Sequence, residues 1–191
     1  MQGMINRSLE SFLRTTYGDA IWQEILHLAR INQGDFLAMA SAHPSDGRRV
    51  VWAAARILGK PVDEMLEDLG GWLVRLEPIR RLLRFSGTDF VEFVHSLDEL
   101  PGRARMILPD LPPHGLTVER AGPHTYAIRL EGAPAGWIWV LAGALRGMAD
   151  DYGTLALIVV SGQSISLSIA LEDHATSRPF DLSPQPARMS P

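Results

Sequence analysis

The sequence predicts an α+β protein, in which a helical N-terminal lobe is followed by a β-β-α-β-β lobe with an antiparallel sheet. Two observations support this. Over the first hundred residues, apolar side chains recur at helical spacing between glycine and proline breakpoints. After Pro112-Pro113 the period changes, because Tyr126, Ile128 and Leu130 alternate with polar or small residues as in a half-buried strand.

The segments of the helical lobe begin and end at recognisable residues. A first helix ends at Gly18, and Asp19 is a plausible N-cap for the second. The polar residues 32–35 predict a turn and residues 43–47 a loop. Gly59 ends the helix that follows this loop.

The later helices follow the same rules. Pro61 stands where the first turn of a helix tolerates proline, and Gly87 ends a short apolar helix. Thr88 or Asp89 caps the next helix. Residues 97–108 form a last short helix before the proline pair.

The second lobe contains two pairs of strands around one apolar helix. Its predicted elements are strands at 117–120 and 126–130, a helix at 137–149 packed on the sheet, and a hairpin of strands 155–160 and 165–171. We expect one domain over residues 1–174, with the helical lobe at about 1–111 and the α/β lobe at about 112–174. The polar, proline-rich residues 175–191 predict a disordered tail.

The composition limits the class of protein. The 191 residues carry a formal net charge of −4 and a pI of about 5.8, which does not favour nucleic acid as a partner. There is no cysteine, so disulfides, thiolate ligands and thiol catalysis are excluded. No secretory signal is present, and no segment approaches the roughly 20 apolar residues of a membrane span. We therefore expect a cytoplasmic protein.

A series of short motifs resembles one known family. Among the matching motifs are Met4-Ile5-Asn6-Arg7-Ser8-Leu9-Glu10, Tyr17-Gly18-Asp19-Ala20-Ile21-Trp22, Leu58-Gly59-Lys60-Pro61, Leu97-Asp98-Glu99-Leu100 and Ala142-Gly143-Ala144-Leu145-Arg146-Gly147. Their order and spacing over about residues 1–171 resemble the heme NO/oxygen-binding domains (H-NOX, HNOB). The resemblance implies a helical lobe over a mixed lobe, with heme b between them.

The resemblance also shows where the heme chemistry is missing. The histidine that binds iron in the family belongs at Pro101, and proline has no side-chain lone pair to offer a metal. The family's Tyr-x-Ser-x-Arg motif, which holds the heme propionates, falls at Leu130, Gly132 and Pro134, none of which has a side-chain donor. We therefore expect no cofactor here, although heme b is the cofactor of the family.

Substitute ligands are limited to imidazole and thioether groups. His95 and His114 are weak candidates, and Met106 is a third. The competing interpretation is a half-exposed helix residue for His95, a loop residue for His114 and core packing for Met106. Tyr126 and Arg129 lie near the propionate positions, but at the wrong spacing.

Other groups of residues have simple structural interpretations. No phosphate loop, hydrolase elbow or zinc spacing is present, so we expect no catalytic residues and no enzyme. The acidic group at 63–68 is interpreted as a solvated helix face, and the arginines at 80, 81, 84, 103 and 105 as a surface that offsets nearby acids. The five tryptophans are interpreted as core packing, with bulky side chains that also fill the volume left by heme.

We therefore expect a non-enzymatic sensor or signalling module. Its interlobe pocket is heme-free and either filled by side chains or bound to an apolar, acyl-like ligand. The alternatives are a heme-binding gas or redox sensor with a substitute axial ligand, and a ligand-free interaction scaffold. The predicted pocket lining is Ile5, Leu9, Leu73, Leu97, Leu100, Trp137, Leu141 and Leu145. The resemblance implies a signalling partner, such as a histidine kinase or a cyclic-di-nucleotide enzyme.

Overall fold

The computed structural model describes residues 2–37, 45–102 and 115–170. Its helices are α1 (Gln2–Tyr17), α2 (Asp19–Ala29), α3 (Gln33–Leu37), α4 (Asp46–Leu58), α5 (Val62–Leu73), α6 (Glu77–Arg84), α7 (Phe90–His95), the 3-10 turn η1 (Leu97–Glu99) and α9 (Trp137–Tyr152). Its strands are β1 (Gly115–Gly122), β2 (Thr125–Glu131), β3 (Ala156–Ser161) and β4 (Ser164–Ile169). The predicted Met106, His114, Arg103, Arg105 and the tail lie outside the described residues.

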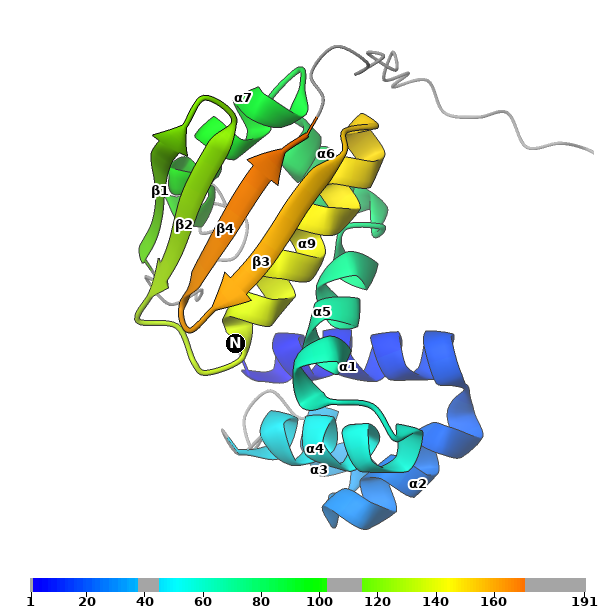
Figure 1. Ribbon diagram of the computed structural model, residues 1–191. Coiled ribbons are helices and arrows are strands. Elements are labelled where there is room, and N and C mark those ends of the chain that lie inside the picture. Colours follow the sequence, from blue (N-terminus) through cyan, green and yellow to red (C-terminus); the bar gives the residue numbers. More distant parts are fainter. Residues whose placement is uncertain (1, 38–44, 103–114, 171–191) are drawn as a thin grey trace, which may run out of the picture.

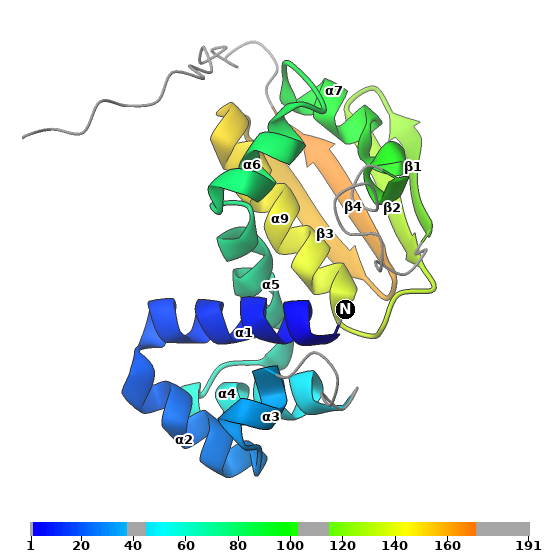
Figure 2. The same ribbon diagram turned by 180° about the vertical axis from the view of Figure 1, so that it is seen from behind.

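The predicted fold class is confirmed. The four strands form one antiparallel sheet in the order β1-β2-β4-β3, and α9 connects β2 to β3 across one face. The helices α1 to α4 gather at the other end of the molecule, and α5 joins them to α9 (Figures 1 and 2). No helix of the described residues is long and apolar enough to cross a membrane.

One local prediction is wrong. Residues 32–35 do not form a simple turn, because the five-residue helix α3 begins at Gln33. The side-chain oxygen of Asn32 accepts a hydrogen bond from the backbone N–H of Gly34 at 3.1 Å. The same polar residues that indicate a turn therefore begin a short helix, since both structures need a side-chain acceptor at that point.

The apolar side chains form two cores. The helical core contains Trp22, Phe12, Leu13, Ile25, Phe36 and Met65, all almost fully buried. The core between α9 and the sheet contains Tyr126, Ile128, Leu145, Met148, Ile165 and Leu167. The apolar side of α9 faces this sheet core, as its sequence predicts.

Helices α5 and α9 touch through their backbones where the two lobes meet. A Cβ atom added to Gly70 of α5 would lie 2.0 Å from the carbonyl oxygen of Val140. A Cβ atom added to Gly143 of α9 would lie 1.8 Å from the carbonyl oxygen of Glu67. Both distances are far shorter than any real contact, so only glycine permits this crossing.

Arg146 strengthens the same junction. Its Nη2 donates to the backbone carbonyl of Ile158 on β3 at 3.0 Å, and its Nε donates to the carboxylate of Glu67 on α5. One side chain of α9 therefore contacts both the other helix and the sheet. The bond to Ile158 also satisfies a backbone carbonyl of β3, which is an edge strand of the sheet.

Candidate functional site

Six of the eight predicted lining residues belong to or pack against one of the two cores. Leu9 and Leu73 belong to the helical core, whereas Leu97 and Leu145 are 1% exposed in the sheet core. Several of the eight keep part of their surface accessible, namely Ile5, Leu73, Leu100, Trp137 and Leu141. The structure thus assigns Leu9 and Leu73 to one core and Leu97, Leu100, Leu141 and Leu145 to the other, whereas Ile5 and Trp137 belong to neither.

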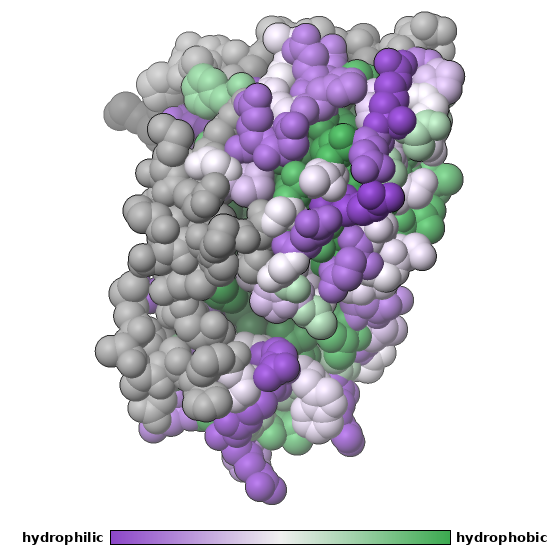
Figure 3. Space-filling view, turned by 90° about the vertical axis from the view of Figure 1, so that its left-hand side faces the viewer, coloured by the Kyte–Doolittle hydropathy of each residue, from purple (hydrophilic) through white to green (hydrophobic). Residues whose placement is uncertain are grey.

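A space-filling view shows an apolar recess beside this part of the molecule. Figure 3 looks onto the side that carries β1 and β2, and it shows recessed apolar surface at mid-height. Apolar surface in a recess is typical of a site that accepts an apolar ligand or partner.

Pro101 lies in the helical turn that follows η1. It is half-buried, and it follows Leu97, which is buried in the sheet core, by four residues. A proline at the start of a helix loses nothing, because the first backbone N–H groups of a helix have no partner within it. The position therefore serves the local backbone, with a side chain that cannot ligate a metal.

Of the three predicted propionate positions, Leu130 lies near the end of β2, and Gly132 and Pro134 lie between β2 and α9. Leu130 pairs with Leu116 of β1 and packs against the sheet core. Gly132 has φ +71°, a left-handed conformation that suits glycine and strains serine. Pro134 accepts a hydrogen bond at its carbonyl from the N–H of Trp137, at 3.2 Å. None of the three has a side chain that donates a hydrogen bond.

The polar side chains near these positions have other partners. Arg129 is exposed and pairs with Glu119 at 3.1 Å. Tyr126 is 2% exposed, and its hydroxyl lies 3.4 Å from Nε2 of His95 on α7. The two rings meet edge to face with centroids 5.2 Å apart. His95 is an exposed residue at the end of a helix, and its Nε2 faces a tyrosine hydroxyl of the sheet.

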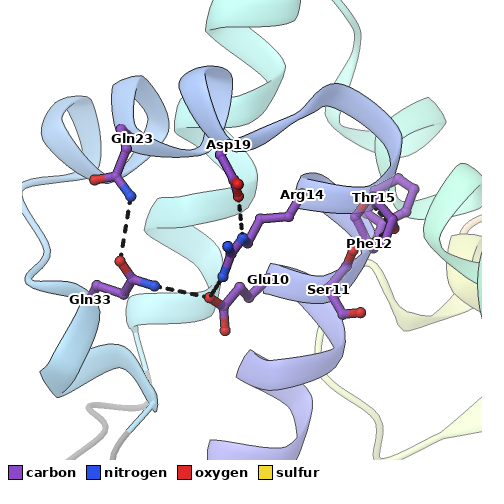
Figure 4. A network of polar contacts seen from close by, with 8 residues as sticks. All are labelled: Glu10, Ser11, Phe12, Arg14, Thr15, Asp19, Gln23 and Gln33. Carbon is purple, nitrogen blue, oxygen red and sulfur yellow. Dashed lines mark hydrogen bonds and ion pairs between the residues drawn. The ribbon is translucent and has the colours of Figure 1, made fainter.

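A separate polar cleft lies at the corner of α1 and α2. Its volume is about 440 Å³, and its lining consists of Glu10, Ser11, Arg14, Thr15 and Asp19 (Figure 4). Arg14 donates to Asp19 at 2.5 Å and to Glu10 at 3.0 Å, and these bonds raise the pKa of its guanidinium. Glu10 also accepts from Gln33 of α3 at 3.1 Å. The network joins three helices, and its charged groups already satisfy one another.

The charged groups predicted to be structural are paired. Arg80 and Arg84 both lie against Asp151, at 2.6 Å and 3.6 Å, and Arg81 pairs with Glu77. Of the acidic group at 63–68, Asp68 pairs with Lys60 and Glu67 with Arg146. Within the described ranges, no three His, Asp or Glu side chains gather as a metal site.

Comparison with known sequences decides the family. The profile of the family described as Haem-NO-binding (HNOB) matches residues 2–159. The chain belongs to the H-NOX family. Soluble guanylate cyclase gcy-31 of Caenorhabditis elegans is 22% identical to this H-NOX domain over 155 residues, which are 79% of this chain and 22% of the cyclase. Soluble guanylate cyclase gcy-35 is 31% identical over 104 residues, 52% of this chain and 15% of the cyclase. The chain thus spans about a fifth of the length of these curated relatives.

Solved structures confirm the fold. An H-NOX protein from S. oneidensis, a triple mutant in the Fe(II) state, superposes with a TM-score of 0.75 and 15% identity over 92% of this chain and 100% of that one. The Fe(II) unliganded H-NOX protein from K. algicida superposes with a TM-score of 0.71 and 14% sequence identity. This match covers 97% of this chain and 100% of that one. At this identity the likeness shows the fold alone.

The residues at the heme positions of this H-NOX domain do not fit heme. The ligand position offers no lone pair, and the three propionate positions offer no donor. Gly132 adds a backbone reason, because its φ of +71° disfavours the serine that the motif requires. Iron and both propionates would each need new partners.

Sequence reasoning missed one residue that stands out in the structure. Trp52 of α4 is 49% exposed, so its interpretation as core packing is wrong. The position on α4 explains this, because the buried side of that helix consists of Val50, Val51, Ala53, Ala54 and Ala55. The arginines four residues before and after Trp52 were the available signal of a solvent face.

Proposed function

We propose that this H-NOX domain is a non-enzymatic sensor or signalling module that works without heme. The observation that carries the proposal is the combined loss at Pro101, Leu130, Gly132 and Pro134 of every side chain able to bind iron or propionate. A single change at the ligand position would favour a replacement ligand. Four changes together favour a site that no longer holds the group.

The interlobe region then has one of two uses. It is either filled by side chains or bound to an apolar, acyl-like ligand. The partly exposed Leu73, Leu100, Trp137 and Leu141 support an apolar occupant, because each leaves part of a hydrophobic side chain accessible. Leu97 and Leu145 support partial filling, because both are 1% exposed.

The output of the module is proposed to pass to a partner protein. The curated relatives are soluble guanylate cyclases, of which this chain matches only a small part. A sensor domain without catalytic residues needs an effector. We propose a histidine kinase or a cyclic-di-nucleotide enzyme as that partner.

Two measurements on the purified full chain test the occupant of the pocket. Native mass spectrometry followed by organic extraction should detect a bound acyl-chain lipid if the site is open. Absence of any co-purifying small molecule supports the ligand-free scaffold instead. Stoichiometric heme that is lost in a His95→Ala or His114→Ala variant would replace the proposal with a heme sensor using a substitute axial ligand.

A further inference from the structure

The solvent face of α4 carries a line of cationic and aromatic side chains. Arg48, Trp52 and Arg56 stand four residues apart, so they follow one another along the same side of the helix. All three are exposed, and Trp52 keeps 49% of its surface accessible. We call these three residues the Arg-Trp-Arg face.

The Arg-Trp-Arg face is not neutralised within the described part of the chain. The guanidinium of Arg56 lies over the ring of Trp52, 5.2 Å from its centroid, and neither Arg48 nor Arg56 has an ion pair among the described residues. The acidic side chain of the same helix, Asp46, pairs with Arg49 instead. Several other arginines, such as Arg14, Arg80 and Arg146, contact carboxylates.

We infer that the Arg-Trp-Arg face docks an acidic segment of a partner protein. Two carboxylates of the partner would bind Arg48 and Arg56, and an apolar side chain between them would cover Trp52. Arginine suits this task because its planar guanidinium binds a carboxylate through two hydrogen bonds while stacking on an aromatic ring. Tryptophan and arginine are also the residues that most often dominate the affinity of protein interfaces.

The small number of arginines favours a protein segment over a membrane surface. Recognition of anionic lipids typically needs a cluster of about four to eight basic residues, whereas this face has two. A helix with two acidic residues eight positions apart matches the spacing of Arg48 and Arg56 and meets both arginines at once.

The inference deepens the proposed signalling role. It rests on that proposed function in one respect, namely that the partner is a protein. Helix α4 belongs to the helical part of the molecule, distant from the sheet (Figure 1). Substitutions on its solvent face should leave the absorption spectrum and the extracted ligand unchanged. Failure here and failure of the heme-free proposal are therefore distinguishable.

The test uses the full chain and a synthetic 15-residue helical peptide. One face of the peptide carries glutamate, leucine and glutamate at four-residue intervals, and a control peptide has glutamine in place of each glutamate. Fluorescence anisotropy of the labelled peptide measures binding to the wild type, to Arg48→Glu/Arg56→Glu, and to Trp52→Ala. The control variant Arg75→Glu/Arg81→Glu changes the net charge by the same amount away from α4, since Arg75 lies in the turn after α5 and Arg81 lies on α6.

The inference predicts binding of the acidic peptide that weakens at least about tenfold in the Arg48/Arg56 variant and several-fold in Trp52→Ala. The control variant should bind as the wild type does, and the glutamine peptide should bind at least about tenfold more weakly. Equal binding by both double variants would overturn the inference, as would no binding to the wild type. Co-sedimentation with phosphatidylglycerol vesicles that depends on Arg48 and Arg56, without peptide binding, would also overturn it and assign the face to a membrane.

Discussion

Gly143 of α9 lies directly against the backbone of Glu67 of α5, so closely that an added Cβ atom would overlap the Glu67 carbonyl oxygen at 1.8 Å. Gly70 makes the reciprocal approach to Val140, at 2.0 Å. These two contacts hold the helical lobe on the sheet lobe. The geometry of the interlobe seam therefore depends on two positions without side chains.

Gly143→Ala should destabilise the protein by at least about 2 kcal/mol, because the methyl group forces two packed backbones apart. Gly102→Ala is the matched control, since Gly102 is helical and has no atom within 4 Å of an added Cβ. We expect the control to remain within about 1 kcal/mol of the wild type. Urea unfolding followed by circular dichroism measures both; equal midpoints would contradict the packing described.

Arg146→Met should cost about 1 kcal/mol, because it removes a charged donor from the Ile158 carbonyl together with the ion pair to Glu67. Arg129→Met removes an exposed pair with Glu119 and should cost less than about 0.5 kcal/mol. A double-mutant cycle of Arg146→Met with Glu67→Gln separates the ion pair from the backbone contact. A cycle with no coupling would show that the ion pair contributes nothing.

Tyr152→Phe should cost about 1 kcal/mol at neutral pH, because the hydroxyl donates to the Gly87 carbonyl at 2.8 Å. Burial raises the pKa of Tyr152, while nearby Arg84 opposes this rise. A raised folded-state pKa means that the stabilisation is complete below the unfolded value of about 10 and is lost as pH rises through the folded value. The advantage of the wild type over Tyr152→Phe should therefore shrink above about pH 10. A constant difference between pH 8 and pH 11 would contradict this account.

Glu92→Gln tests the start of α7 at acid pH. The backbone N–H and the hydroxyl of Thr88 both donate to the carboxylate of Glu92, which lowers its pKa. Because the pKa of Glu92 is lower in the folded state, its carboxylate stabilises the fold at pH values above its unfolded-state pKa of about 4.3. This stabilisation is lost as the pH falls through the folded-state pKa. Chemical unfolding at pH 7 should show the wild type to be more stable than Glu92→Gln, and this difference should shrink as the pH falls below about 4. A difference in stability that does not change between pH 7 and pH 3 would assign the effect to something other than charge.

Much of the fold was predictable because local signals and packing agree. Gly18, Gly59 and Gly87 break the helical pattern, and Asp89 caps α7 through the N–H of Glu92 at 2.8 Å. The change of period near the proline pair predicts the sheet lobe, including the hairpin of β3 and β4. The short helix α3 was not predictable, since an asparagine followed by glycine begins turns and helices alike.

The site was only partly predictable, because spacing does not reveal which elements meet. Pro101 and Gly132 stand out in the sequence, but the left-handed backbone of Gly132 is visible only in the structure. Gly143 belongs to a motif that matches the family, but the sequence does not disclose that Gly70 and Gly143 each lie against the backbone of the other's helix. Trp52 was misplaced because a tryptophan between alanines and valines indicates a core until the direction of the helix face is known.

The absorption spectrum of the full chain, expressed with added heme precursor, tests the central claim most directly. We predict no sharp Soret band at stoichiometric intensity, because neither Pro101 nor the residues at 130, 132 and 134 can hold iron or propionate. Ferrous protein exposed to nitric oxide should likewise show no spectral shift. A stoichiometric Soret band that shifts with nitric oxide would contradict the account and identify this chain as a heme sensor with a substitute ligand.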